Sequence, residues 1–443
     1  MLNLLGQSVS RTCEGTSRRN FLRVGSLGLG TAAVGLPDLL RARGEAADRS
    51  SVRDTSVIWL WLGGGPTHVE TFDPKMTAPV EYRSAVGEVA TSLPGVTIGG
   101  LFPKIAQASN HFSFIRSFAH TNSGHGGGTH YVMTGYDYPP ADNNLPPIKP
   151  SLGSILARQR GASHPQTGIP TYVRMNGIYG DGAAWLGASH GPFDSAGEAQ
   201  RNMNLQVAVD RLDDRRGLLQ GLDRINREAD RTGLMRGLDA FETQAFDLVL
   251  GRAKDAFDLQ REDPRIRSKY GTGVGEQLLL ARRLCEAGVR FVQVNYSDDS
   301  NNPAWDQHSD MPKHALHARA TDVPVAGLLA DLKRRGLLED TIVWWGGEFG
   351  RTPYAQDDGT GRDHNPAGFT VWLAGGGFRA GHVHGATDDF GHHAVTDRVH
   401  MHDLHATLLA ALGLDHTRLT FRHAGRDHRL TDVAGRVEER LFA

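Results

Sequence analysis

Short runs of apolar residues recur along the chain, and polar or glycine-rich stretches separate them. Such continuous runs are typical of strands that are buried on both faces of a parallel sheet. β-branched and aromatic residues fill them, which favours strand over helix. The runs that we predict as strands are Ser56–Leu62, Phe112–Ile115, Thr171–Val173, Val289–Val294, Ile342–Trp345 and Phe369–Leu373.

Amphipathic segments lie between several of these runs and predict helices, most clearly at Glu276–Ala287, Val323–Arg335 and Leu404–Leu412. This alternation predicts an α/β fold, in which helices cover both faces of a mostly parallel sheet. Residues 205–265 differ, because they are charged, have spaced leucines and contain no strand-like run. We therefore predict one domain over residues 48–443, with a helical subregion at about 205–265.

The first 47 residues have the pattern of an export signal. Ser17–Arg23 (SRRNFLR) is a twin-arginine motif, and the apolar, glycine- and alanine-rich segment Val24–Leu36 follows it. That segment is shorter than the roughly 20 apolar residues of a membrane span, but it fits the apolar core of a signal peptide. We therefore expect the twin-arginine translocase as a partner during export, a periplasmic or secreted protein, and no membrane span after cleavage.

The charge balance argues against nucleic acid as a partner. Residues 1–47 contain six of the 48 Lys and Arg and three of the 50 Asp and Glu, so the remainder has 42 basic against 47 acidic residues, about −5. This balance provides no basic footprint for phosphates. Aromatic residues make up only 7% of the chain, which is too few for a base-stacking platform.

Acidic and imidazole groups lie in loops at the ends of three strand-like runs, where open α/β sheets place their ligands. The loops have the sequences WDQHSD, GGEFGR and GRDHNP. Carboxylate oxygen and imidazole nitrogen are both acceptable ligands of zinc or manganese. The candidate metal ligands in these loops are Asp306, His308, Glu348, Asp363 and His364.

Two further loops contain possible acid–base groups. Residues 120–130 (HTNSGHGGGTH) hold three histidines in a glycine-rich turn that leads into a helix-like segment. Imidazole is both a common metal ligand and a natural general base. The candidates there are His120, Ser123, His125, Thr129 and His130. The loop after the first run adds His68, Glu70 and Asp73, and its glycines lack the spacing of the common nucleotide-binding motifs.

These motifs resemble those of a known family. SRRNFLR, LGGGPTHVETFDPK, HGGGTHYVMTG, LLARRLCEAGVRFVQVN, WDQHSD, GGEFGRTP and GRDHNP occur in this order from the signal to about Leu414. The chain is similar to the exported bacterial proteins grouped as domain of unknown function 1501, which resemble sulfatases of the alkaline phosphatase-like superfamily. The resemblance implies an α/β/α sandwich and a metal-assisted hydrolase ancestry.

The resemblance also implies roles for four residues. By motif position, Glu348 resembles the metal-binding acid at the end of a strand, and His364 resembles a later histidine ligand. Asp306 and His308 resemble the pair of ligands in the preceding loop.

Three positions depart from the superfamily pattern. Gly63 or Gly64 stands where the first strand usually ends in a metal-binding Asp, and Phe349 stands where a histidine is expected. His125 occupies the place of the usual Ser, Thr or Cys nucleophile. The chain contains no Cys-x-Pro-x-Arg sequence, which excludes formylglycine maturation of the usual sulfatase kind.

We predict a metal-dependent hydrolase that acts on phosphate or sulfate esters of small molecules or polysaccharides. One or two divalent cations, zinc before manganese or calcium, would polarise the ester. A metal-activated water, Ser123 or Thr129 would attack, and His125 or His130 would transfer the proton. The alternative is a non-catalytic binding or scaffold protein on a degenerate hydrolase fold, which the departures at Gly64 and Phe349 favour. A phosphomutase-like transferase is a weaker option, because phosphorylated sugars are mainly cytosolic.

Overall fold

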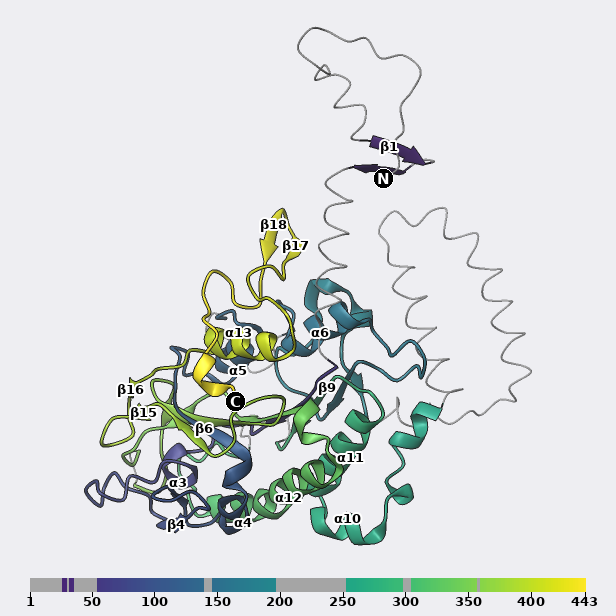
Figure 1. Ribbon diagram of the computed structural model, residues 1–443. Coiled ribbons are helices and arrows are strands. Elements are labelled where there is room, and N and C mark those ends of the chain that lie inside the picture. The colour runs from purple at the N-terminus through teal and green to yellow at the C-terminus, as the bar shows by residue number, and fades with distance from the viewer. Residues whose placement is uncertain are drawn as a thin grey trace. The chain divides into compact units, whose positions relative to one another are not determined.

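The computed structural model describes residues 26–29, 32–35, 54–138, 146–196, 252–297, 304–356 and 359–443 (Figure 1). The chain divides into two units, Met1–Val52 and Arg53–Ala443. The first unit contains two antiparallel strands, β1 (Ser26–Leu29) and β2 (Ala32–Gly35), inside the predicted signal. Most of the predicted helical subregion at 205–265 lies outside the described residues, and the boundary at residue 47 stays a prediction.

A sheet of eight strands, in the order β14-β6-β13-β10-β3-β9-β7-β8, forms the centre of the second unit. All six predicted strands belong to it. Its members are β3 (Ser56–Trp61), β6 (Phe112–Phe118), β7 (Tyr172–Met175), β8 (Phe193–Asp194), β9 (Phe291–Asn295), β10 (Thr341–Gly346), β13 (Phe369–Ala374) and β14 (His382–His384). Every pairing is parallel except the two that β13 makes with β10 and β6. The prediction of a mostly parallel sheet is therefore confirmed.

The reversed direction of β13 decides which loops meet. In the antiparallel pairing Val343 lies opposite Ala374 and Trp345 lies opposite Trp372, so β13 begins beside the end of β10. The chain that enters β13 carries His364, and the chain that leaves β10 carries Glu348. Both loops therefore reach the same edge of the sheet, whereas a parallel β13 would have placed them at opposite edges.

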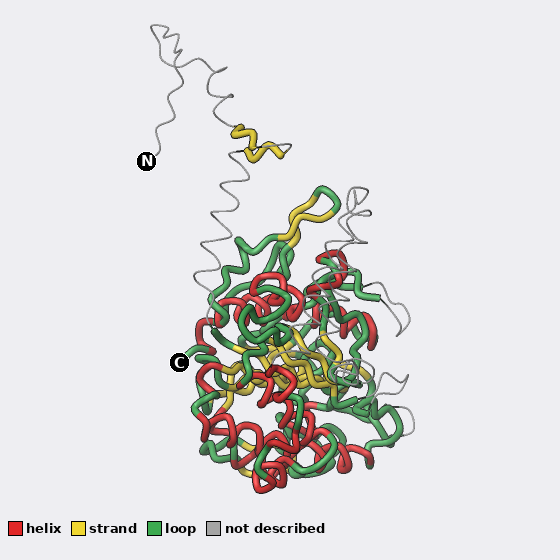
Figure 2. Tube along the Cα trace, turned by 90° about the vertical axis from the view of Figure 1, so that its right-hand side faces the viewer, coloured by secondary structure: helices red, strands yellow, loops and turns green. Residues whose placement is uncertain are grey.

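Helices cover both faces of the sheet (Figures 1 and 2). One face carries α4 (Pro103–Gln107), α10 (Pro264–Tyr270), α11 (Val274–Glu286) and α12 (Lys313–Arg335), and the other carries α5 (His125–Thr134), α6 (Leu152–Arg160) and α13 (Met401–Ala411). Helix α12 begins ten residues before the predicted start at Val323 and continues through Pro324. Its packing against α4, α10 and α11 outweighs the tendency of proline to break a helix. Within the described residues, no helix has both the length and the apolarity needed to cross a bilayer.

The remaining α-helix and strands of the second unit are short. They are α3 (His68–Thr71), β4 (Glu88–Ala90), β5 (Thr97–Gly99), β11 (Gly350–Arg351), β12 (His364–Asn365), β15 (Ala386–Thr387), β16 (Ala394–Thr396), β17 (Phe421–His423) and β18 (Arg426–His428). The hairpin of β11 and β12 matters most for the site, because it connects β10 to β13 and pairs Arg351 with His364.

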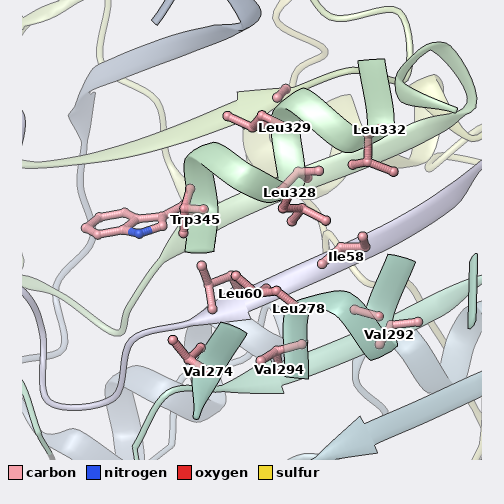
Figure 3. Close-up of a cluster of buried hydrophobic side chains, with 14 of the residues drawn as sticks. Ile58, Leu60, Val274, Leu278, Val292, Val294, Leu328, Leu329, Leu332 and Trp345 are labelled. Carbon is pink, nitrogen blue, oxygen red and sulfur yellow. The ribbon is translucent and has the colours of Figure 1, made fainter. Parts of the chain in front are cut away.

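Alternate residues of the central strands pack on opposite faces of the sheet. Ile58 and Leu60 of β3 lie in one cluster with Leu278 of α11 and Leu328 of α12 (Figure 3). Trp59 of β3 points to the other face. Every residue of β3, β9, β10 and β13 is buried, which explains why their sequences are mostly apolar.

We expect Trp344→Ala to lower the free energy of unfolding by about 3–5 kcal/mol, as deletions of large core aromatics do. Trp344 is fully buried, and its ring stacks on those of Trp59 and Trp61. The distances between ring centroids are 3.9 Å and 5.8 Å. Urea unfolding followed by circular dichroism would measure the loss. Trp185→Ala is the control, because Trp185 is only half-buried and stacks on His423 outside the sheet. Equal losses in the two variants would contradict this account of the core.

Candidate metal centre

Three imidazoles and one carboxylate converge at the carboxyl edge of the sheet. They belong to His125, Asp306, His308 and His364, and one donor atom from each lies within 4.8 Å of the others. His125 is the first residue of α5, Asp306 and His308 follow β9, and His364 lies in β12. The strand order thus brings together donors from three separate parts of the chain.

Asp306 contacts every other member of this cluster. Its Oδ1 lies 2.9 Å from Nε2 of His308 and 3.2 Å from Nε2 of His364, and its Oδ2 lies 3.1 Å from Nε2 of His125. The buried guanidinium of Arg351 donates to the same Oδ1 at 2.5 Å. Burial favours the neutral acid, but the hydrogen bond from His125 and the charge of Arg351 outweigh it and hold the pKa of Asp306 well below its usual value. The carboxylate is therefore charged at neutral pH.

The ring protons of His308 and His364 point away from the centre. Nδ1 of His364 donates to the carbonyl oxygen of Ser123 at 2.6 Å, and Nδ1 of His308 donates to Oε1 of Gln356 at 2.6 Å. In the neutral rings both Nε2 atoms therefore carry lone pairs, and these atoms lie only 2.9 Å apart. Two lone pairs and an oxygen of Asp306 thus face one another, an arrangement that a cation would satisfy.

Glu348 orients His125 by a hydrogen bond to Nδ1, the ring nitrogen that does not face Asp306. Nδ1 of His125 donates to Oε1 of Glu348 at 2.8 Å, and the same oxygen accepts the backbone N–H of Gly64 at 2.7 Å. Burial lowers the pKa of His125, but the carboxylates of Glu348 and Asp306 outweigh it and raise that pKa to about 9. Carboxylates commonly orient a ligating imidazole in this way. Oε2 of Glu348 is buried and has no hydrogen-bond partner among the described residues.

Three other predicted residues lie close to the cluster. Asp363 is exposed, and its Oδ1 lies 3.8 Å from Nδ1 of His308. Ser123 is also exposed and contributes its carbonyl oxygen rather than its hydroxyl. Thr129 is buried one helical turn after His125 and lines a narrow crevice together with Glu348. None of the three belongs to the set of four donors.

His120 and His130 make hydrogen bonds to the backbone instead. His120 accepts the N–H of Asn122 at Nδ1, so its Nε2 donates to the carbonyl oxygen of Glu348. Burial lowers the pKa of His120 to about 4, so the ring is neutral at physiological pH. His130 donates from Nδ1 to the carbonyl oxygen of Tyr136 at 2.8 Å. Both rings therefore stabilise the loops around the cluster.

The structure does not bring the candidates of the loop after β3 to the cluster. Nε2 of His68 lies 2.6 Å from the carbonyl oxygen of Gly391, before β16. Glu70 forms a buried ion pair with Arg362, and Asp73 forms an ion pair with a neighbouring lysine. The sequence predicted three potential ligands in this loop, but their side chains contact other residues of the protein, away from the cluster.

The family model described as "Protein of unknown function (DUF1501)" matches residues 54–442. The chain belongs to this family. The match confirms the resemblance that the motifs of the chain indicate. No curated protein matches the chain.

Several solved structures are similar to this DUF1501 chain. The Ps i-CgsB structure in complex with k-i-k-neocarrahexaose is 12% identical, covers 82% of this chain and 73% of its own, and has a TM-score of 0.41. The PsFucS1 sulfatase from Pseudoalteromonas sp. is 13% identical, with 84% and 72% covered and a TM-score of 0.37. The lipoteichoic acid synthase LtaP from Listeria monocytogenes is 10% identical, with 84% and 78% covered and a TM-score of 0.34.

Arg351 is the main site residue of the DUF1501 chain that sequence reasoning missed. It is 1% exposed and donates to the carbonyl oxygens of Gly64 and Gly65 as well as to Asp306. One signal was available, because Arg351 stands in the motif GGEFGRTP three residues after Glu348. Arginine is always charged and has five donors, so a buried arginine needs several acceptors around it.

Proposed function

We propose that this DUF1501 protein is an exported, metal-dependent hydrolase of phosphate or sulfate esters. The observation that carries the proposal is the pair of Nε2 lone pairs, on His308 and His364, that face Oδ1 of Asp306. Imidazole pairs at this distance are unfavourable without a shared cation or proton, because neither ring has a hydrogen to give the other.

The chemistry of the donors favours zinc. Three histidine nitrogens and one carboxylate oxygen are within the usual ligand set of zinc, and manganese accepts the same atoms. Calcium prefers six to eight oxygen ligands and fits this set less well. When bound, such a cation would polarise the ester and stabilise the negative charge that develops on it.

Thr129 is the hydroxyl that we propose for contact with the attacking water or the ester. Four other threonines in the described helices donate to the carbonyl oxygen four residues earlier: Thr71, Thr134, Thr321 and Thr407. Within the described residues Thr129 makes no such bond. Its crevice, which it shares with His125 and Glu348, has a volume of about 20 Å³, enough for roughly one water molecule. A proton released there would pass to Oε2 of Glu348, which has no hydrogen-bond partner among the described residues.

Metal analysis combined with an ester screen tests the proposal. Purified exported protein would be assayed for bound metal and for hydrolysis of p-nitrophenyl phosphate and p-nitrophenyl sulfate, with and without a chelator. We expect near-stoichiometric zinc and chelator-sensitive hydrolysis, and loss of both in His364→Ala. His393→Ala is the control, because that ring is 60% exposed and lies outside the cluster. Metal-free protein without any turnover would overturn the proposal.

The second candidate function is ligand binding without catalysis. It is favoured by His125 at the start of α5, because an imidazole held by Glu348 and Asp306 replaces the hydroxyl or thiol nucleophile that the superfamily pattern has there. Full zinc occupancy without turnover of any tested ester would support this alternative. Chelator-sensitive turnover would exclude it.

We expect Glu348→Gln to weaken zinc binding by roughly 10–100-fold, the usual cost of losing an outer partner of a ligating histidine. The amide preserves the size of the side chain but removes the negative charge next to Nδ1 of His125. Competition with a chromophoric chelator would measure the affinity. Asp363→Asn is the matched control, since it removes an exposed carboxylate near His308 and should change affinity less. Equal losses would show that general electrostatics, not the contact with His125, matters.

We expect the double substitution Arg18→Lys and Arg19→Lys to leave most of the protein in the cytoplasm. The twin-arginine pathway recognises this pair as an address, and lysine does not reproduce the planar, five-donor guanidinium. Cell fractionation with an antibody against the protein would measure the distribution. Arg11→Lys, outside the motif, should be exported normally. Normal export of the double variant would contradict the assigned route.

A further inference from the structure

A buried ion pair lies near the candidate metal centre but does not belong to its set of four donors. Glu70 is 0% exposed and Arg362 is 6% exposed, and Oε1 of Glu70 lies 2.7 Å from Nη2 of Arg362. Among the described residues, no hydrogen bond joins either side chain to the four donors. Removing two charges from water costs free energy, and the attraction between the charges often does not offset that cost. A contribution to stability therefore does not explain why this pair is buried here.

The carboxylate of Glu70 is fixed within the loop that follows β3. Its Oε2 accepts from the hydroxyl of Thr67 at 2.6 Å, and its Oε1 accepts from the backbone N–H of Ala85 at 3.2 Å. Burial favours the neutral acid, but the charge and hydrogen bond of Arg362 outweigh it and lower the pKa of Glu70. Glu70 is therefore a rigid, charged acceptor.

The side chain of Arg362 connects this acceptor to the loop that carries His364. Its guanidinium donates to the carbonyl oxygen of Thr352 at 3.1 Å and to that of Pro353. These carbonyls lie at the start of the loop that leaves β11, and Arg362 lies at its end, two residues before His364. A planar group with five donors can join all of these acceptors at once.

The backbone of Arg362 connects the same loop to the other donors. Its N–H donates at 3.0 Å to the carbonyl oxygen of Gln307, the residue between Asp306 and His308. Its carbonyl oxygen accepts at 3.0 Å from Arg351, which also holds the carboxylate of Asp306. Residue 362 is thus the point where the loop of Asp306 and His308 meets the loop that ends at His364.

We propose that the Glu70–Arg362 ion pair is a positioning pair, which fixes the loop of Asp306 and His308 relative to His364. Metal affinity depends on placing donor atoms to within about 0.5 Å, and supporting contacts outside the donor set provide that precision. The part of this inference that concerns metal rests on the proposed function. The part that concerns the two loops does not.

Glu70→Gln is the direct test, because it keeps the size of the side chain and removes its charge. Hydrogen exchange of the metal-free variant, followed by mass spectrometry, should become faster in residues 304–308 and 359–365 together. Affinity for Co²⁺ and Zn²⁺, measured by competition with a chromophoric chelator, should fall roughly 10–100-fold. The visible absorption of the cobalt-loaded variant should also differ from that of the wild-type protein, because it reports the arrangement of the ligands.

Glu262→Gln is the matched control. Glu262 is also a buried glutamate, 8% exposed, and it pairs with the buried guanidinium of Arg282 on α11. The control should lower the melting temperature as Glu70→Gln does, yet leave both exchange segments, the cobalt spectrum and metal affinity unchanged. A purely structural role of Glu70 would make the two variants alike and would overturn the inference.

The paired substitution Glu70→Leu with Arg362→Met covers the case in which Glu70→Gln fails to fold. Replacing both charges by apolar residues of similar size leaves no unpaired charge and is often neutral for stability. This variant leaves no unpaired charge, so it should melt at a higher temperature than Glu70→Gln and still show faster exchange and weaker metal binding. Wild-type exchange and affinity in the folded variant would overturn the inference. A wild-type protein that binds neither metal would count against the proposed function alone, because the exchange result still decides whether the pair holds the two loops.

Discussion

Asp306→Asn is expected to abolish stoichiometric metal binding and, with it, any chelator-sensitive ester hydrolysis. The carboxylate of Asp306 contacts His125, His308 and His364, at 3.1, 2.9 and 3.2 Å. The amide keeps the shape of the side chain but removes the only carboxylate among the four donors. We expect the loss of affinity to exceed the roughly 100-fold cost of losing a partner outside the donor set.

The same substitution should lower the stability of the metal-free protein. The pKa of Asp306 is held well below its usual value despite burial, in part by the charge of Arg351. Asparagine would leave that buried guanidinium without its nearest negative charge, which costs about 3 kcal/mol in comparable buried pairs. Urea unfolding in the presence of a chelator would measure the change.

Asp310→Asn is the control for this prediction. Asp310 is a half-exposed carboxylate of the same loop, and it pairs with Lys313 on the surface. Its loss should leave zinc content unchanged and stability within about 1 kcal/mol, as for other surface pairs. An Asp306→Asn protein that retains full zinc content would contradict the assignment of the centre.

Gly64→Ala is expected to disrupt the centre from a position that carries no functional group. Gly64 has φ of +104°, and an added Cβ would lie 2.4 Å from the backbone nitrogen of Asp306 and 2.8 Å from the carbonyl carbon of Trp305. Both atoms belong to the backbone, so the loop of Asp306 must move. The N–H of Gly64 also donates to Glu348, which orients His125. We therefore expect a loss of metal affinity of at least tenfold together with a loss of stability.

Gly87→Ala separates the backbone strain of Gly64→Ala from its steric clash with the loop of Asp306. Gly87 also has a positive φ, +69°, but no atom lies within 4 Å of an added Cβ. It should show only the backbone strain of a non-glycine residue in this region, about 1–3 kcal/mol. Thermal unfolding and chelator competition on both variants would give the comparison. If Gly64→Ala loses no more stability than Gly87→Ala and keeps its metal affinity, the close approach of the two loops is not important for the centre.

Much of the fold follows from local sequence patterns. The apolar runs became β3, β6, β7, β9, β10 and β13, because strands that are buried on both faces are mostly apolar. The position of a carboxylate or imidazole directly after such a run also follows from the sequence. That is why the loops of Asp306, His308 and His364 could be expected to meet, and the structure does bring these three side chains together.

The use of each side chain depended on contacts between distant residues. Glu348 was predicted as a metal ligand, but its Oε1 receives the N–H of Gly64 and Nδ1 of His125, so the structure places it behind the four donors. His125 was predicted to transfer protons, and the same contacts turn its Nε2 toward Asp306. A hydrogen bond across more than 200 residues has no local signature in the sequence.

The sequence by itself determined six of the eight strands of the central sheet and the loops that carry Asp306, His308 and His364, since burial imposes a pattern that local composition reveals. Only the tertiary structure decided the antiparallel direction of β13, the close contact of Gly64 with Asp306, and the tie between Glu70 and Arg362. Each of these depends on the packing of elements that are far apart in the chain, where strand order and shape complementarity, not local propensity, select the contacts.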